Sequence, residues 1–285
     1  MSESRMKTST GEAAGAAEGE TPASERRSPL RLLGGMIVRP RATMVDLRDH
    51  GARTWWLPAL LAAVFVVLPV LVAAPITARM TREAVVTAQE QFGEQQDEDM
   101  SEEQRAQMEQ AMSIAASPLI TTVFPAVGGV VSVAAGWAIW AGALYLAGMA
   151  LGGRSTFGQL FRMVAWAWLP FTLRGLIQTI YIAISGEIIA NPGLSGLMRD
   201  NPVSGGEMIV APPSLDQTLL AAFLSKIDLF LIWNLILLVI GMTAITRLPR
   251  RKALLGTLGV WILLMALSLV PALVGGLFTQ QAGGF

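Results

Sequence analysis

The sequence contains no cysteine and a single histidine, His50, among its 285 residues. Without cysteine the chain can form no disulfide, and it offers neither a thiol nucleophile nor a thiolate ligand for a metal. A histidine-based metal site or catalytic triad also lacks a second member. We interpret His50, which follows Asp49, as a surface residue, and we expect no bound metal or cofactor.

Charged residues are scarce as well. They make up 15% of the chain, against ~25% in an ordinary soluble domain, while 53% of the residues are hydrophobic and the mean hydropathy is +0.51. The 21 basic and 21 acidic residues leave no net charge, which gives no basis for binding nucleic acid. This composition predicts an integral membrane protein whose apolar residues face lipid or pack between spans.

Several enzyme signatures are missing, namely the phosphate-binding GxxxxGK[ST], the zinc-binding HExxH and the serine-hydrolase GxSxG patterns. Nine acidic residues lie between Glu83 and Glu109, but they lack the Asp-x-Asp-x-Asp-Gly spacing of a calcium loop. We therefore predict that the protein is not an enzyme, and we interpret the acidic stretch as part of a solvated helical hairpin.

Long apolar runs are what the sequence has in abundance. The clearest covers residues 227–245, IDLFLIWNLILLVIGMTAI, whose one charge, Asp228, stands near its start. At ~1.5 Å per residue, roughly 20 residues cross a hydrocarbon core of ~30 Å. The sequence predicts an all-α membrane protein, a bundle of five transmembrane helices with a helical extracytoplasmic hairpin between spans one and two. The predicted spans cover about residues 55–76, 119–151, 164–189, 219–246 and 253–278.

The segments outside the spans differ in composition. Residues 1–28 are small and polar, which predicts a disordered cytoplasmic tail, and residues 279–285 form a short C-terminal tail. Residues 77–117 form the acidic extracytoplasmic loop, with helices predicted over about 79–92 and 101–115. A capping box, in which the hydroxyl and amide groups of Ser101 and Gln104 satisfy backbone N–H groups, opens the second of these helices.

Residues 29–53 mix apolar side chains with arginines. Such a segment is expected to lie on a membrane surface, with its apolar face toward lipid and its arginines among anionic headgroups. The alternative is a juxtamembrane linker with no lipid preference. Pro40 is expected to divide the segment into two short helices, because proline breaks the helical hydrogen-bond ladder.

Proline and glycine predict irregular geometry within the spans. The prolines of the first span favour a bent helix. The second span, residues 119–151, is longer than a perpendicular crossing requires, so it either tilts or begins outside the bilayer. Gly148 and Gly152 have the spacing of a close helix contact. Pro170 predicts a bend in the third span just before Arg174.

The basic residues indicate the orientation of the chain, since lysine and arginine accumulate in cytoplasmic loops. Fifteen fall on one side of the five spans and four on the other. The larger set is Arg5, Lys7, Arg26, Arg27, Arg31, Arg39, Arg41, Arg48, Arg53, Arg154, Arg162, Arg247, Arg250, Arg251 and Lys252; the smaller is Arg79, Arg82, Arg105 and Arg199. We predict a multi-pass protein of the plasma membrane with a cytoplasmic N-terminus and an extracytoplasmic C-terminus.

Intramembrane polar residues are the candidate functional residues, because burying them is costly and they usually face the bundle interior. Arg174 lies ~15 Å along the third span, and Asn234 ~10 Å below the outer edge of the fourth. We hypothesise that Arg174 is satisfied by Asn234 together with Asp228 or Glu187. Such a cluster is either a polar clamp that fixes how spans three and four pack or part of a substrate or proton pathway.

Four stretches together resemble the bacterial branch of the Yip (Ypt-interacting) domain family. They are RPRATM at 39–44, LGGRSTFG at 151–158, AWAWLP at 165–170 and IDLFLIW at 227–233, within a resemblance that covers about residues 29–276. It implies a five-helix membrane domain with a cytoplasmic N-terminus. Eukaryotic members bind small Rab-type GTPases, but this chain lacks their DLYGP and YKGxP motifs, so no small GTPase partner is implied. Some bacterial members are linked to export by ABC transporters.

Two functions follow as hypotheses. The first is a non-enzymatic scaffold or accessory subunit for other membrane proteins, such as components of an ABC export transporter. Its working surfaces would be the basic cytoplasmic segments and the outer acidic hairpin. The second is a small transporter or channel that uses the polar residues around Arg174. Beyond the lipid bilayer itself, the sequence names no partner.

Overall fold

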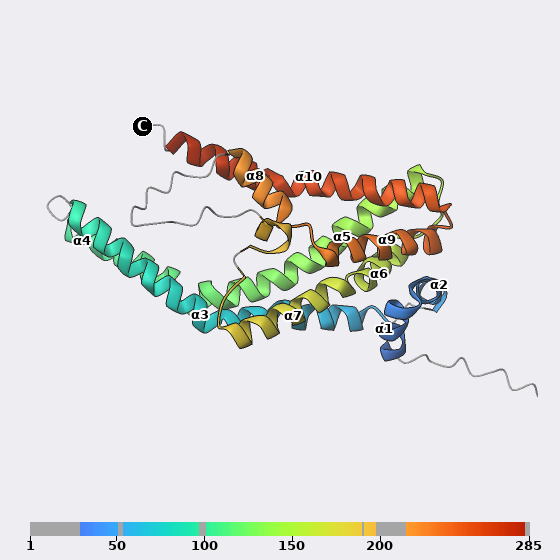
Figure 1. Ribbon diagram of the computed structural model, residues 1–285, viewed down its shortest axis with the longest axis horizontal. Coiled ribbons are helices and arrows are strands. Elements are labelled where there is room, and N and C mark those ends of the chain that lie inside the picture. Colours follow the sequence, from blue (N-terminus) through green and yellow to red (C-terminus); the bar gives the residue numbers. More distant parts are fainter. Residues whose placement is uncertain (1–28, 51–53, 97–100, 190, 198–214, 283–285) are drawn as a thin grey trace, which may run out of the picture.

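The computed structural model describes residues 29–50, 54–96, 101–189, 191–197 and 215–282. The regular elements in these residues are all helical (Figure 1). They are α1 (Pro29–Val38), α2 (Pro40–His50), α3 (Trp56–Gln96), α4 (Glu102–Ala115), the π-helix η2 (Leu119–Val123), α5 (Phe124–Ala150), α6 (Phe157–Ala167), α7 (Leu169–Ser185), the 3-10 helix η3 (Gly193–Leu197), α8 (Leu215–Leu224), α9 (Leu229–Thr246) and α10 (Arg250–Ala282).

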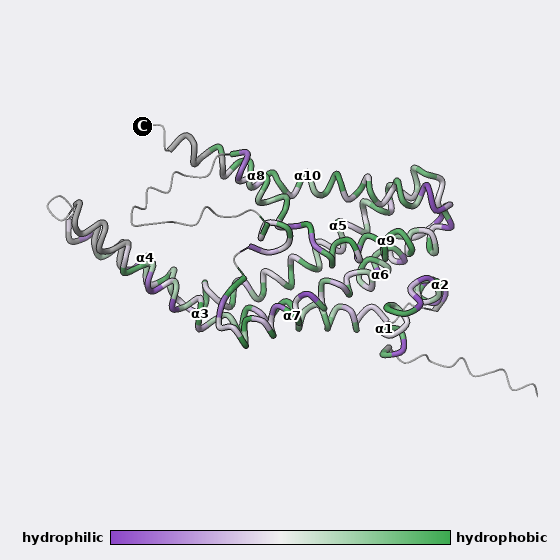
Figure 2. Tube along the Cα trace, viewed as in Figure 1, coloured by the Kyte–Doolittle hydropathy of each residue, from purple (hydrophilic) through white to green (hydrophobic). Residues whose placement is uncertain are grey.

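Within the described ranges, five helical segments are long and apolar enough to cross a membrane, which confirms the predicted all-α class with five spans. They cover Trp56–Thr87, Leu119–Ala150, Phe157–Ser185, Leu229–Thr246 and Arg250–Gly275. Figure 2 shows these helices as mostly hydrophobic, with hydrophilic residues gathered on α2 and at the turn that precedes α10.

The spanning helices run side by side along the long axis of the molecule (Figure 1). Helix α3 packs against α7 and α5, α5 packs against α6, and α10 packs against α8, α9 and α5. Helices α1 and α2 lie at one end of this bundle, which we call the α2 end. Helix α4 and the C-terminal part of α3 project beyond the other end, which we call the α4 end.

The first span is longer than the sequence analysis predicted. Instead of ending near residue 76 and giving way to a separate helix over 79–92, the chain continues as one helix, α3, from Trp56 to Gln96. Pro69 and Pro75 lie inside it, and the residues after Pro75 include many good helix formers and neither glycine nor proline until Gly93. At ~1.5 Å per residue, α3 is roughly twice as long as the hydrocarbon core is thick.

The second span matches its predicted bounds, and the third begins earlier than predicted. Helix α5 continues η2 and ends at Ala150. The third span begins at Phe157, not 164, because Thr156 forms a capping box with Gln159. It is interrupted at Trp168, two residues before Pro170, and its helix ends at Ser185, where Gly186 adopts a left-handed conformation (φ 70°).

The fourth span is shorter than predicted. A break between Leu224 and Leu229 separates α8 from α9, so the membrane-spanning part begins at 229 and not at 219. Helix α8 instead packs on α10. Helix α10 contains the predicted fifth span and runs on to Ala282, so residues 279–282 are helical and not a tail. The predicted tail over 1–28, and residues 283–285 of the predicted C-terminal tail, lie outside the described residues.

The predicted glycine pair at 148 and 152 does not lie on one helix face. Gly148 is buried on α5, where an added Cβ would meet Met242 and Thr246 of α9 at 3.6 Å. Gly152, in contrast, follows the end of α5 in a turn with φ 85°, and nothing lies within 4 Å of an added Cβ. Close packing of α5 on α9 therefore involves Gly148 alone of the two.

Helices α1 and α2 correct another expectation. Pro40 divides them, as predicted, but their apolar face does not simply lie toward lipid. Met36, Met44 and Leu47 are at most 2% exposed and belong to the main hydrophobic core, and α2 packs against α9 and α6. Burying a large apolar side chain against other helices stabilises this docking by ~1.5–3 kcal/mol per residue. Only part of α1, including Leu30 and Val38, keeps an exposed apolar surface.

Candidate functional site

The ion pair between Arg174 and Asp228 is the central feature of the site. Arg174 lies on α7, and its Nη1 is 2.7 Å from Oδ2 of Asp228, which directly precedes α9. The two side chains are 25% and 13% exposed. The ion pair joins two neighbouring spans, because α7 packs against α9.

Asp228 holds the start of α9 as well. Its backbone is extended (φ −149°, ψ 177°), and its Oδ1 accepts a hydrogen bond of 2.7 Å from the backbone N–H of Leu231. This is the geometry of an N-cap, in which a short polar side chain satisfies one of the free N–H groups of the first turn. One carboxylate therefore both begins α9 and neutralises Arg174.

Asn234 does not bond to Arg174, contrary to the prediction. Its Nδ2 donates a hydrogen bond of 2.7 Å to the backbone oxygen of Ala167, the last residue of α6. In a continuous helix that oxygen would accept from Phe171, but the N–H of Phe171 bonds to Trp168 instead. Pro170, at the start of α7, accompanies this break. Asn234, 1% exposed, thus satisfies a carbonyl freed where the third span is interrupted.

Glu187 is not part of the cluster. It follows the left-handed Gly186 and lies past the end of α7, with an exposed side chain. Its backbone N–H donates to Oγ of Ser185 at 3.1 Å. The turn at Gly186 takes the chain out of the helix before Glu187, so the carboxylate cannot continue the face that carries Arg174.

A hollow of about 360 Å³ lies beside the ion pair, between α5, α7, α9 and α10. Aromatic side chains form much of its wall, and Trp168 packs edge-on against Trp140 and close to Phe171, with ring centroids 6.4 and 4.9 Å apart. Its lining residues are Trp140, Trp168, Phe171, Arg174, Ser225, Lys226, Leu231, Asn234, Trp261, Leu264, Met265 and Ser268.

Two polar atoms on the wall of this hollow have no hydrogen-bond partner in the described part of the chain. They are Oδ1 of Asn234, an acceptor, and Nε1 of Trp261, a donor. A buried polar group without a partner costs roughly 1–3 kcal/mol. A molecule that enters the hollow with both a donor and an acceptor would remove that cost.

The sequence analysis did not include Lys226 or the aromatic residues in the site. Lys226 stands two residues before Asp228, in the break that interrupts the predicted fourth span, and it lines the hollow. Its closeness to Asp228 in the sequence was the signal that could have placed it in the site. The aromatic residues come from three separate spans, and nothing in the sequence shows that Trp140 and Trp261 share a wall. Only the arrangement of α5, α7, α9 and α10 brings them together.

The α2 end of the bundle has a different polar arrangement. Nη1 of Arg48 donates to the backbone oxygen of Ala244, near the end of α9, at 3.0 Å. Its Nε also pairs with Asp49 at 2.7 Å, and this hydrogen bond raises the pKa of Arg48 above its ordinary value. Arg48 thereby ties α2 to the last turn of α9 and satisfies a carbonyl at a helix C-terminus.

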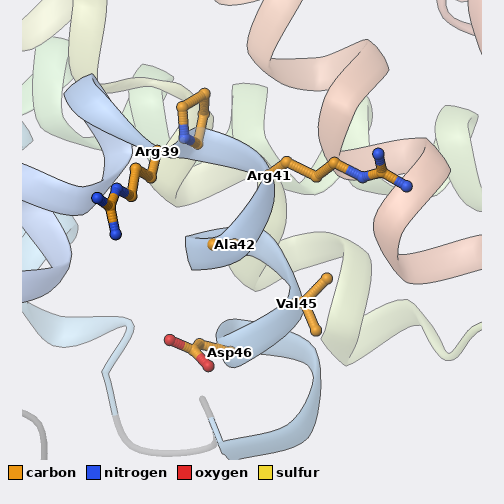
Figure 3. A pocket seen from close by; sticks show the side chains of 6 residues that line it. Arg39, Arg41, Ala42, Val45 and Asp46 are labelled. Atoms are coloured by element: carbon orange, nitrogen blue, oxygen red, sulfur yellow. The ribbon is translucent and has the colours of Figure 1, made fainter.

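A second hollow, of about 610 Å³, opens on the surface at the start of α2 (Figure 3). Its lining residues come from α2 and the residue before it, and in Figure 3 the side chains of Arg39 and Arg41 point in opposite directions. The two guanidinium groups therefore do not converge on one ligand. We interpret this region as an open basic surface and not as a small-molecule site.

The described residues contain no group of three or more acidic or histidine side chains that could hold a metal ion. His50 ends α2. The candidate site thus consists of an ion pair, one further cation, an aromatic wall and two unpartnered polar atoms.

In the comparison with family models, the Yip1 domain matches residues 34–272. Comparison with curated proteins gave no match, and neither did comparison with solved structures. The matched residues extend from α1 into α10 and contain the ion pair, the hollow and nearly all of the five spans. The chain therefore belongs to the Yip1 domain family of membrane proteins.

Proposed function

We propose that the protein is a non-catalytic scaffold or accessory subunit for other membrane proteins, such as components of an ABC export transporter. It would act in the plasma membrane with the α2 end in the cytoplasm and the C-terminus outside. Membership of the Yip1 domain family supports a role within a membrane. The partner and the cellular membrane are part of the proposal.

The packing at the α2 end is the observation that carries this proposal. Met44 of α2 lies beside Gly241 of α9 and Met163 of α6, and all three are buried. Trp166 and Leu238, also fully buried, fill the same core. A close-packed interior leaves no room for water or solute. This end of the bundle is therefore closed. A closed end is compatible with a scaffold that binds other proteins, whereas a channel or transporter needs a path for its solute.

The charges at the α2 end support the proposed orientation. Arg31 on α1, Arg39 between α1 and α2, and Arg41 on α2 are all exposed. Arg250 and Arg251 are exposed at the start of α10. Both groups lie at the same end of the bundle (Figure 1). Basic residues that gather at one end indicate the cytoplasmic side. They also provide a docking surface for an acidic segment of a partner.

The alternative function, a small transporter or channel, draws on the hollow beside Arg174. That hollow lies at the start of α9, whereas the closed core lies toward its end. A complete pathway would require α2 to leave α6 and α9, which exposes Met36, Met44 and Leu47. Losing that burial costs several kcal/mol at ~1.5–3 kcal/mol per side chain.

Affinity purification tests the proposal. The tagged full-length protein is isolated from its native membrane in a mild detergent, and co-purifying proteins are quantified by mass spectrometry. We expect a stoichiometric membrane-protein partner that is lost in the double variant Arg39→Gln/Arg41→Gln. Glu187→Gln, which neutralises an exposed charge outside both proposed working surfaces, serves as the matched control. A protein that purifies alone, and that moves solute when reconstituted in liposomes, would support the transporter instead.

A further inference from the structure

The residues around the hollow carry an uneven balance of charge. Arg174 is neutralised by Asp228 at 2.7 Å, whereas Lys226 adds a second cation to the same wall and pairs with no described residue. The lining residues together with Asp228 therefore have a net charge of +1. Because an uncompensated cation next to an apolar wall attracts an anion strongly, the hollow favours a ligand that carries an anionic group.

The depth of the hollow identifies where such a ligand would come from. Helix α9 has 18 residues and is thus ~27 Å long, close to the ~30 Å of a hydrocarbon core. Asp228 at its start, and Lys226 just before it, therefore stand at the boundary between hydrocarbon and headgroups. Phospholipid phosphates lie at this level, and basic pockets between spans recognise them.

The hollow reaches inward from this boundary. Asn234 lies six residues into the span, ~9 Å below Asp228, and Trp261 lies ~16 Å along α10 from its start at the α2 end. These two side chains supply the unpartnered acceptor and the unpartnered donor. A simple anion held at the boundary would leave both unpaired, whereas a headgroup drawn into the hollow can reach them.

We propose that this hollow binds the headgroup of a phospholipid from the leaflet at the α4 end. The phosphate lies between Arg174 and Lys226 and accepts from the indole N–H of Trp261. A hydroxyl or ammonium of the headgroup donates to Oδ1 of Asn234. The acyl chains leave toward lipid over exposed apolar residues such as Leu229 of α9 and Leu267 of α10.

This proposal predicts the order in which four lipids bind to the hollow. Phosphatidylglycerol and phosphatidylethanolamine carry both the phosphate and a donor. Phosphatidylcholine has the phosphate but no N–H or O–H donor, and diacylglycerol has no phosphate. We expect the first two to bind more tightly than phosphatidylcholine, and diacylglycerol to bind least. The proposal does not depend on any protein partner, so it can fail or hold independently of the scaffold function.

The test uses delipidated full-length protein in detergent, titrated separately with these four lipids. Native mass spectrometry counts the bound lipid, and tryptophan fluorescence follows binding because Trp140, Trp168 and Trp261 line the hollow. Lys226→Gln should weaken binding of the two favoured lipids about tenfold, the effect of losing one charge-assisted hydrogen bond. Trp261→Phe keeps a ring but removes the donor, and it should weaken binding severalfold.

The control is Arg250→Gln, which removes an exposed cation at the opposite end of the bundle and should leave binding unchanged. Size-exclusion chromatography establishes that each variant is folded. Equal affinity for diacylglycerol, or unchanged binding by Lys226→Gln, would overturn the phosphate assignment. Binding of soluble glycerol phosphate as tight as that of the lipids would show a free-anion site instead. Equal binding of phosphatidylcholine would refute the role of Asn234.

Discussion

Substitutions at Asp228 should separate its two roles. Asp228→Asn keeps an oxygen that can accept from Leu231 but removes the charge that pairs with Arg174, whereas Asp228→Ala removes both. Leaving one partner of a buried ion pair unpaired costs ~3–5 kcal/mol. Since the Arg174 side chain is 25% exposed, water screens part of this cost. We therefore expect loss of the ion pair to lower the free energy of unfolding by about 2 kcal/mol.

The N-cap adds a second loss in the alanine variant. Replacing a capping aspartate by alanine costs ~1 kcal/mol, whereas asparagine caps about as well as aspartate. We therefore expect Asp228→Ala to lose about 3 kcal/mol and Asp228→Asn about 2 kcal/mol. At ~2–4 °C per kcal/mol for a chain of this size, the midpoints fall by roughly 9 and 6 °C.

A double-mutant cycle isolates the ion pair. Arg174→Gln alone should cost about 2 kcal/mol, and Arg174→Gln/Asp228→Asn should cost ~1–2 kcal/mol less than the sum of the two single changes. The charge-reversed double variant, Arg174→Glu/Asp228→Arg, should be less stable than the original pair. Arginine at position 228 cannot accept the hydrogen bond from the backbone N–H of Leu231, so the N-cap is lost even if the ion pair re-forms. Neutralisation is thus a cleaner test than reversal.

Thermal unfolding of the purified protein in detergent, followed by the loss of the monodisperse peak in size-exclusion chromatography, measures these effects. Far-UV circular dichroism verifies that each variant starts from the same helical content. Additive single and double variants would refute a direct pair between Arg174 and Asp228. Equal stability of Asp228→Asn and Asp228→Ala would refute the capping role.

Three further predictions concern packing and orientation. Gly175→Ala should lower the unfolding midpoint, at a cost of about 1–3 kcal/mol, because its Cβ would clash with the backbone oxygen of Phe65 on α3; Gly259→Ala, in open space, should not. Met44→Ala should cost ~2–5 kcal/mol and make α1 and α2 more sensitive to limited proteolysis. Because the chain has no cysteine, single-cysteine labelling tests orientation: Arg41→Cys should react only with a permeant reagent, and Glu103→Cys with an impermeant one. The opposite labelling pattern would reverse the proposed topology.

The five spans were predictable because hydrocarbon thickness fixes how long an apolar run must be. Residue counting placed Arg174 at a depth similar to that of Asn234 and offered Asp228 as one further partner; in the structure Asp228 is the partner, at 2.7 Å. Counting residues along a helix gives the depth of a side chain in the membrane, but not the direction in which it points around the helix axis. Asn234 has a suitable depth, yet it faces the carbonyl of Ala167. Glu187 was misplaced because the left-handed turn at Gly186 ends α7.

The helix boundaries were harder to predict, because local signals compete with hydropathy. The apolar run from 219 to 246 is almost continuous, but the cap at Asp228 starts a new helix inside it. At Pro75 the opposite happened, and the helix continued through a residue that commonly ends one. Proline and capping residues indicate where a break is allowed. Neighbouring helices decide whether it occurs.

The docking of α2 was invisible to sequence patterns, since an amphipathic helix has the same periodicity whether its apolar face meets lipid or protein. Its position nevertheless decides what the hollow at Arg174 can do. With Met44 packed against α6 and α9, the buried core around Leu238 and Met242 lies between the hollow and the α2 end. A site closed at its inner end can hold a lipid or another ligand but cannot pass it across the bilayer. Binding at the hollow is therefore compatible with a scaffold, whereas transport would require Arg48 to release Ala244 and α2 to move.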